Sequence, residues 1–237
     1  MKQVILFILI ALCWSMYSCN NTQEPDLSDI SSDTIPFRDL QKEEALSPEQ
    51  LKALTERTGR LSNYKLLYNY SSNVESTMIL IMHDGENTQV QQVVKNTIDE
   101  NGVLSMKSMD EYKYVFSENT KYTKVNDEWV AENYIFTTPA QDMTYTYTVN
   151  DLVCNNFFET LINALDAAKY NIVKNHYTIP DINLTHNNET LLFEDVFLTF
   201  EGGYLREIFC TNSTQSICIQ LTGVDNVHEE SASTNEE

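Results

Sequence analysis

Apolar and polar residues alternate along much of the chain between residues 63 and 149, and this pattern predicts β-strands. In the first such segment Tyr64, Leu66, Tyr68 and Tyr70 alternate with Lys65, Leu67 and Asn69. A period of two places the two sets on opposite faces of a sheet. Further runs of this type are Thr77–His83, Gln89–Ile98, Val103–Phe116, Lys121–Val125, Trp129–Thr137 and Thr144–Val149. Turn-forming pairs such as Asp84-Gly85 and Asn101-Gly102 separate them, so we expect an antiparallel meander.

Two segments have a helical period instead. In the first, Ser47 is suited to the N-cap, Pro48 to the first helical position and Gln50 to the third, which together predict a capping box. This helix should cover about residues 48–58 and stop at Gly59. The second helix should cover about residues 152–169, with Asp151 as its N-cap. Its apolar residues share one face and are Cys154, Phe158, Leu161, Ile162, Leu165 and Ala168.

The last three predicted strands constrain one another. Gly202-Gly203 is suited to a two-residue hairpin turn, which would place Phe200 opposite Leu205, Leu198 opposite Glu207 and Val196 opposite Phe209. If Cys210 lies opposite Cys218, Phe209 lies opposite Ile219. One face of these strands is then apolar, and it carries Val196, Leu198, Phe200, Leu205, Phe209, Ile219 and Leu221. Glu207 is the charged exception on that face, and it is either an edge residue or a functional carboxylate.

These elements predict an α+β fold that is mainly β, in which a curved antiparallel sheet wraps one or two helices. We expect a single domain over residues 47–225. Residues 19–46 are polar and acidic without a sustained period, which is typical of a flexible tether with a span of roughly 30 Å. Residues 226–237 are expected to form a disordered acidic tail.

The N-terminus carries an apolar run, residues 4–14, behind the single positive charge of Lys2. A spanning helix needs about 20 apolar residues, so this run is typical of an export signal over residues 1–18. The residues after it, SMYSCNN, resemble the bacterial lipobox, with the small residue Ser18 before Cys19. A lipobox implies that Cys19 carries a thioether-linked diacylglycerol and an added acyl chain such as palmitate. Several acyl chains on one residue anchor a protein stably to a membrane.

Two other interpretations of the N-terminus stay open. An ordinary secretory signal cut near Ser18 would leave Cys19 as a plain thiol. The chain also contains five N-x-S/T sequons, which keep a secreted eukaryotic glycoprotein in consideration; they begin at Asn20, Asn69, Asn183, Asn188 and Asn212.

The composition narrows the classes of partner. The formal net charge is −20, and the 15 basic residues are scattered along the chain. Nucleic-acid binding requires clustered Lys and Arg, so no nucleic-acid partner is expected. Direct attraction to an anionic membrane surface is not expected, for the same reason.

The remaining candidate residues indicate no reaction. His83, His176, His186 and His228 lie too far apart for a metal-binding motif, and His186 with Glu189 is a weak pair. The chain has no G-x-S-x-G motif, Walker loop or G-x-G-x-x-G motif, so we expect neither enzymatic activity nor a cofactor. Cys210 and Cys218 are candidates for a cross-strand disulfide, and Cys154 for a buried thiol. The tyrosines Tyr64, Tyr68, Tyr70, Tyr145 and Tyr147 would suit either core packing or a carbohydrate or lipid groove.

The chain also resembles a known superfamily. Residues 121–130 (KYTKVNDEWV) are similar to a hairpin that occurs in many bacterial lipoproteins. The order of elements over residues 47–225 resembles the lipoprotein-carrier superfamily of LolA- and LppX-like folds. In that superfamily a curved antiparallel sheet wraps helices and leaves an apolar cavity for acyl chains. The resemblance is architectural, so it transfers no functional residue to this chain.

Two functions follow from these observations. The first is a lipid-anchored cell-envelope protein, on the extracytoplasmic side of the membrane, that binds a lipid or other apolar ligand between its sheet and the helix at 152–169. The second is a surface-displayed interaction module with a fully packed core that contacts another envelope protein. Both hypotheses give the chain a membrane location through Cys19.

Overall fold

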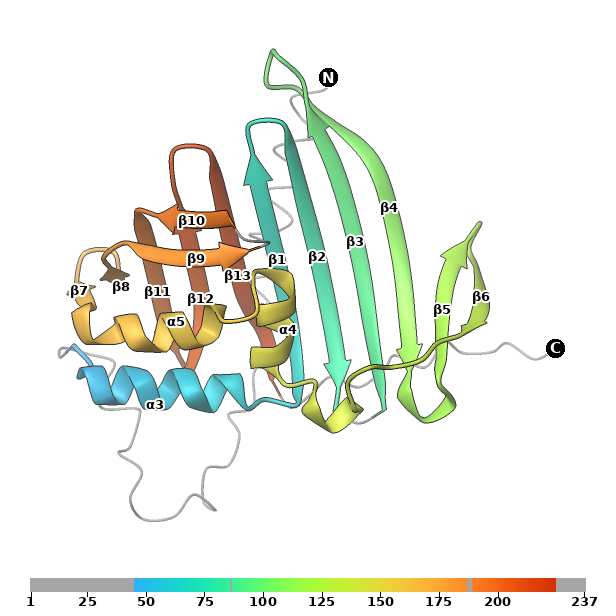
Figure 1. Cartoon of the computed structure of the whole chain (residues 1–237), viewed down its shortest axis with the longest axis horizontal. Coiled ribbons are helices and arrows are strands. Elements are labelled where there is room, and N and C mark those ends of the chain that lie inside the picture. The colour runs from blue at the N-terminus through green and yellow to red at the C-terminus, as the bar shows by residue number, and fades with distance from the viewer. Residues whose placement is uncertain (1–44, 86, 187–188, 225–237) are drawn as a thin grey trace. The chain divides into compact units, whose positions relative to one another are not determined.

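The computed structural model describes residues 45–85, 87–186 and 189–224 (Figure 1). In these ranges the fold is α+β and mainly β, as expected, with a curved antiparallel sheet in the order β6-β5-β4-β3-β2-β1-β13-β12-β11-β8-β7. The strands of this sheet are β1 (Asn63–Ser72), β2 (Glu75–Asp84), β3 (Thr88–Ile98), β4 (Leu104–Val115), β5 (Thr120–Val125), β6 (Glu128–Asn133), β7 (Lys169–Asn171), β8 (His176–Ile179), β11 (Asp195–Glu201), β12 (Tyr204–Thr211) and β13 (Gln215–Val224). A separate hairpin pairs β9 (Ile182–His186) with β10 (Glu189–Phe193).

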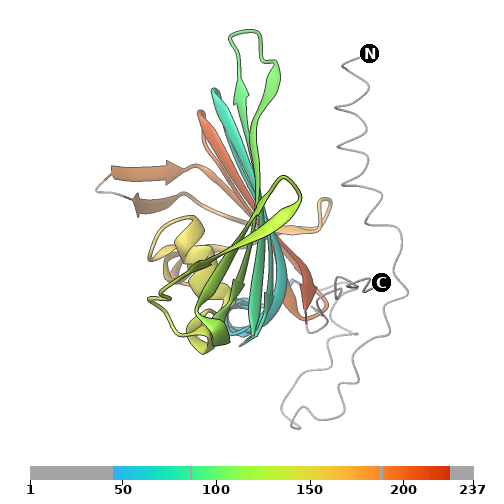
Figure 2. The same ribbon diagram turned by 90° about the vertical axis from the view of Figure 1, so that its right-hand side faces the viewer.

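Three α-helices, α3 (Pro48–Gly59), α4 (Tyr145–Leu152) and α5 (Phe157–Ala164), lie in front of β1 and the strands β11 to β13 (Figure 1). Figure 2 shows α4, α5 and the β9–β10 hairpin on the same side of the sheet. We call this side the inner face and the other side the outer face. The backbone N–H of Leu205 on β12 donates to Thr58 Oγ1 at 2.8 Å, which ties α3 to the sheet.

The start of α3 confirms the predicted capping box. The backbone N–H of Gln50 donates to Ser47 Oγ at 3.3 Å, and the N–H of Ser47 donates to Gln50 Oε1 at 2.8 Å. Two N–H groups that the first helical turn leaves without partners are satisfied in this way. The helix then buries Leu51 and Leu54 against the core and ends at Gly59 as expected.

The core lies between the helices and the inner face. The alternation of β1 is confirmed, because Tyr64, Leu66 and Tyr68 are buried on the inner face. Helix α5 contributes Phe157, Phe158 and Leu161, which are at most 2% exposed. Across the sheet the inner face adds Ile81, Ile179, Val196, Leu198, Leu205, Ile208, Cys210, Ile217, Ile219 and Leu221.

The strand predicted at Thr144–Val149 is wrong. Thr144 is instead the N-cap of α4, and its hydroxyl accepts the N–H of Tyr147 at 3.4 Å. The alternating Thr and Tyr residues imitate a strand, but the side chains that the fold buries are Tyr145, Thr148 and Val149. Their spacing of three and four residues is helical.

The predicted helix at 152–169 is broken and begins later than expected. Helix α4 ends at Leu152, so Asp151 is in its last turn and is not an N-cap. After the break, α5 starts at Phe157 with Asn156 as its N-cap, and a short 3-10 turn (Leu165–Ala167) leads into β7. The side chain of Asn150 spans the break, because its Oδ1 accepts the N–H of Phe158 at 2.9 Å.

A β-bulge changes the register predicted for the last strands. The glycine turn and the pair Phe200–Leu205 are confirmed, but Thr199 lies opposite Glu207, so Arg206 is an extra residue on β12. Beyond the bulge every partner moves by one residue. Ile208 and Cys210 are therefore buried on the inner face, whereas Phe209 and Glu207 are on the outer face. Glu207 Oε2 accepts a hydrogen bond from Gln220 Nε2 at 2.8 Å, which accounts for the carboxylate that the predicted register left on the apolar side.

The same shift separates the two cysteines of the predicted disulfide. Cys218 lies opposite Phe209, and Cys210 lies opposite Ile217. Neighbouring positions on paired strands point to opposite faces, so the two thiols are on different sides of the sheet. Cys154, Cys210 and Cys218 are all free cysteines in the structure.

Candidate functional site

The helices cover only part of the inner face. Helix α3 contacts β12 and α5 contacts β9, while β2 to β6 continue past the helices (Figure 1). The register places Ile79 beside Val93, and Gln91 beside Tyr112 and then Thr123. All five side chains are half-buried. We call this set the open inner face.

The chain between β6 and α4 crosses in front of the lower ends of β2 to β4 (Figure 1). It brings Tyr134 and Phe136 against Tyr114 and Phe116. The ring centroids of Phe116 and Phe136 are 4.8 Å apart, and those of Tyr134 and Phe136 are 4.9 Å apart, both in edge-to-face geometry. Such pairs stabilise a fold by about 0.5–1.5 kcal/mol each beyond their burial. This aromatic cluster closes the lower end of the open inner face.

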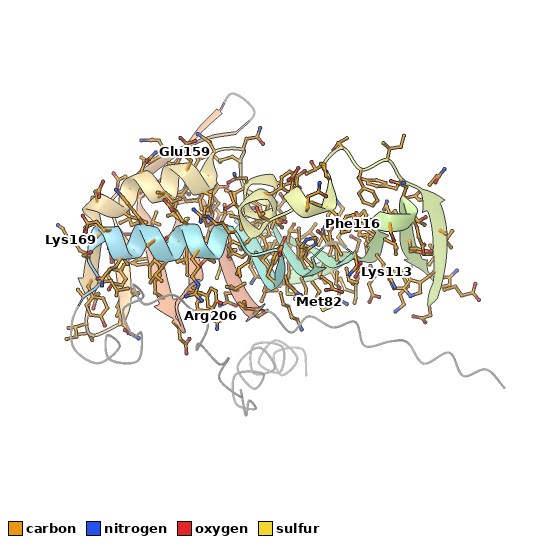
Figure 3. All side chains as sticks on the ribbon, turned by 90° about the horizontal axis from the view of Figure 1, so that it is seen from below. Met82, Lys113, Phe116, Glu159, Lys169 and Arg206 are labelled. Atoms are coloured by element: carbon orange, nitrogen blue, oxygen red, sulfur yellow. The ribbon has the colours of Figure 1, made fainter. Side chains whose placement is uncertain are left out.

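A cavity of about 400 Å³ adjoins the aromatic cluster. It is lined by Phe116, Ser117, Asn119, Phe136, Thr137, Thr138, Pro139, Ala140 and Gln141. Figure 3 shows Phe116 on the inner side of the sheet, whereas Met82 and Lys113 lie on the outer side. Because none of the lining side chains carries a charge, the cavity suits an apolar or uncharged polar group.

His83 is buried between this cluster and the core. Its ring is 0% exposed and lies 5.2 Å from the ring of Tyr64 and 5.8 Å from that of Phe116. Neither ring nitrogen has a hydrogen-bond partner among the described residues. Burial lowers the pKa of His83 to about 4, against a smaller opposing effect of Asp84, so the ring is neutral at pH 7. A neutral, enclosed imidazole acts here as a packing group.

Beneath α5 the space between helix and sheet is filled. Phe157, Leu161 and Leu165 are 0% exposed, so no water-sized void adjoins their side chains. The ligand cavity predicted between the sheet and this helix is therefore replaced at these positions by a packed core. The less covered surface lies further along the sheet, at the half-buried positions of the open inner face.

Most histidine and tyrosine candidates have structural roles. Tyr64, Tyr68 and Tyr145 are buried, which supports core packing over a groove. His176 is on the outer face of β8, and the centre of its ring lies 4.8 Å from that of Phe197. Cys19 and His228 lie outside the described residues, as does the side chain of His186. In the described ranges no group of His, Cys, Asp and Glu could hold a metal ion.

The three cysteines in the described ranges do not provide a nucleophile. Burial raises the pKa values of Cys210 and Cys218 to about 12, and it also raises that of Cys154. These thiols are protonated at neutral pH, and a thiol reacts as its thiolate.

The alternating pattern predicts a single strand over Trp129–Thr137, so it does not reveal the aromatic segment at 134–136. The strand β6 ends at Asn133. Pro139 and the pair Thr137-Thr138 were the available signal that an irregular segment follows.

Among the described helices none is long and apolar enough to cross a membrane.

Comparison with known proteins gives only weak similarities. No family model and no curated protein matches the chain. Among solved structures, LprF from Mycobacterium bovis aligns at 11% identity with a TM-score of 0.34, covering 76% of this chain and 95% of that protein. The DNA polymerase III subunit beta from Pseudomonas aeruginosa aligns at 10% identity with a TM-score of 0.15, covering 76% of this chain and 64% of that one. Similarities at this level assign neither a family nor a function, so the case for function rests on the chain's own residues.

Proposed function

We propose that this chain is a lipid-anchored, non-enzymatic protein of the cell envelope that binds a lipid or other apolar ligand on its open inner face. The proposal of a ligand rests on one observation: the helices leave part of the inner side of β2 to β5, at the half-buried positions of the open inner face, without a covering element, next to the uncharged cavity of about 400 Å³. Ligand sites are commonly apolar and concave, with a few polar groups that orient the ligand. Val93, Ile79 and Tyr112 supply the apolar surface, and Gln91 and Thr123 supply polar groups. Two charges border this surface, because Asp110 lies opposite Val93 and Lys121 Nζ lies 4.9 Å from the centre of the Tyr112 ring.

The anchor rests on the sequence around Cys19. The lipobox-like SMYSCNN follows an apolar run of export-signal length. Lipidation of Cys19 would hold the domain at the extracytoplasmic surface, with residues 20–44 between the anchor and the described domain. An apolar ligand is insoluble in water, so a binding protein held beside a membrane would be close to its source.

Replacing Cys19 by serine tests the anchor. Because hydroxyl oxygen cannot carry the thioether, Cys19→Ser is expected to move the protein from the membrane fraction to the soluble extracytoplasmic fraction after export in a bacterial host. Mass spectrometry of the unaltered protein should show a diacylglycerol-modified N-terminal residue. An unaltered protein that leaves the membrane without any lipid mass would support the ordinary secretory signal instead.

Two neighbouring valines on β3 test the ligand site. Val93 points to the open inner face and Val94 to the outer face, and both are half-buried. A buried carboxylate opposes apolar contact, so Val93→Asp should weaken binding of a fluorescent fatty acid at least about tenfold, which corresponds to about 1.4 kcal/mol. Val94→Asp, the matched control, should bind as the unaltered protein does. Equal loss in both variants, or no saturable binding by the unaltered protein, would contradict the proposal.

The second candidate function is a displayed interaction module, and the packed core beneath α5 favours it. If the unaltered protein binds no lipid while crosslinking on intact cells joins it reproducibly to one envelope protein, this second function replaces the first. Neither function requires catalytic residues, a cofactor or nucleic acid.

A further inference from the structure

The strand β6 forms one free edge of the sheet. Among the described strands it pairs with β5 alone, and all six of its residues are exposed. The N–H of Tyr134 donates to the carbonyl of Asn119 at 2.8 Å, which continues the β5–β6 ladder by one pair. Hydrogen-bonded pairs alternate along an antiparallel ladder, so residues 132, 130 and 128 also bond to β5. The backbone N–H and C=O groups of Trp129, Ala131 and Asn133 therefore point away from the sheet.

This edge has only one of the features that usually protect edge strands, the charged residues Glu128 and Glu132. Proteins also shorten such strands, place Lys or Pro in them, or twist them with a bulge. The segment Glu128–Asn133 contains neither Lys nor Pro, and its register with β5 is continuous. The opposite edge, β7, has only three residues.

Apolar side chains are also exposed along the β6 edge. Trp129 is 44% exposed, Val130 is 53% exposed and Ile135, just past the strand, is 88% exposed. An extended chain that paired with the free backbone groups of β6 would cover part of this apolar surface. Addition of a strand to a sheet edge is a common mode of peptide recognition.

The charges on β6 disfavour self-pairing in the register that is centred on Val130. Glu128, Val130 and Glu132 share the inner face of the strand. Lys121 Nζ lies 2.9 Å from Glu132 Oε1, whereas in the described part of the chain Glu128 has no ion pair. A second copy paired antiparallel about Val130 would place Glu128 opposite Glu132 at both ends, and like charges directly opposite destabilise a sheet. The net charge of −20 adds to the repulsion between two copies.

We infer that the β6 edge binds an extended segment of a different protein, in which basic and apolar residues alternate on one face. The basic residues would lie opposite Glu128 and Glu132 and the apolar residue opposite Val130. This partner site is separate from the open inner face and does not depend on a lipid ligand.

The test uses the full mature chain with Cys19→Ser and a fluorescein-labelled peptide of sequence Thr-Lys-Thr-Val-Thr-Lys-Thr. Fluorescence anisotropy is expected to show saturable binding that weakens as salt is added. Ala131→Pro removes an outward N–H without removing a bond to β5, and it should weaken binding about tenfold. Ala131→Thr keeps this N–H and should bind as the unaltered protein does. Glu128→Lys should also weaken binding, and the peptide with Glu in place of Lys should bind about tenfold less tightly than the Lys peptide.

Several results would overturn the inference. One is the absence of saturable binding by the Lys peptide, and another is equal binding of the Lys and Glu peptides. Sedimentation of the protein alone gives a third: a dimer that Ala131→Pro dissociates would identify a second copy as the occupant of the edge. If Ala131→Pro fails to fold, as judged by its melting temperature, Glu128→Lys decides whether the peptide occupies this edge, and unchanged binding in that variant contradicts the inference.

Discussion

Replacing His83 by phenylalanine is expected to stabilise the domain at neutral pH by about 1–3 kcal/mol. The imidazole is fully buried, and its two nitrogens have no partner within the described residues. A buried polar group without a hydrogen bond loses its hydration and gains nothing in return. A phenyl ring is close in shape and keeps the contacts with Tyr64 and Phe116.

The same histidine predicts a loss of stability in acid. Its pKa is about 4 in the folded protein and about 6.5 in the unfolded chain, so the unfolded chain binds the proton more tightly. The contribution of the neutral ring is present in full above pH 6.5 and is lost as the pH falls to about 4. The loss amounts to about 3 kcal/mol over this interval.

Urea unfolding of the unaltered protein and of His83→Phe at a series of pH values measures both effects. All other ionisable groups are common to both proteins, so the difference in unfolding free energy isolates His83. This difference should grow as the pH falls from 6.5 to 4. A difference that is constant with pH, or a destabilised His83→Phe variant, would show that the imidazole has a polar partner in solution.

Replacing Phe158 by alanine is expected to destabilise the domain by about 3–5 kcal/mol. Phe158 is 2% exposed, and its ring lies 6.0 Å from that of Tyr145 in edge-to-face geometry. It also lies against the end of α3, because a Cβ added at Gly59 would approach Phe158 Cε1 to 2.8 Å and would contact Thr146. The Phe158 ring therefore fills the space where α3, α4 and α5 meet. Its removal would leave a cavity there, because the backbone of the surrounding helices is held in place and cannot fill it.

Ile162→Ala on the same helix is the control for this prediction. Ile162 is half-buried at the margin of the core, so its truncation should cost about 1 kcal/mol. Thermal unfolding of both variants compares the two costs. Similar costs for the two substitutions would mean that the α3–α4–α5 junction is looser than the structure shows.

The elements that could be predicted from sequence are those with strong local signals. The capping box at Ser47 and Gln50 defined the start of α3, and the alternation from Tyr64 to Tyr70 defined the inner face of β1. A segment was predicted incorrectly where its sequence fits both the two-residue period of a strand and the helical period of about 3.6 residues. Thr144–Val149 alternates like a strand, yet it packs as a helix because Tyr145, Thr148 and Val149 reach the core together.

The register of the last strands could not be obtained from the turn alone. A single extra residue at Arg206 reverses the faces of every later position on β12, and no local pattern distinguishes a bulge from a regular strand there. The predicted register places the Glu207 carboxylate on an apolar face, which is energetically costly, and this conflict indicated that the register was wrong. The open inner face was also inaccessible to sequence reasoning, since it depends on how far the helices extend across the sheet.

Native mass spectrometry tests the central claim, that the open inner face binds a lipid or other apolar ligand, most directly. The mature chain with Cys19→Ser would be purified gently from a bacterial host, alone and with Val93→Asp or Val94→Asp added. A lipid adduct on the first protein and on the Val94→Asp variant, but not on the Val93→Asp variant, is the expected result. An adduct that Val93→Asp retains in full, or a ligand-free mass for all three proteins after incubation with host lipids, would contradict the claim.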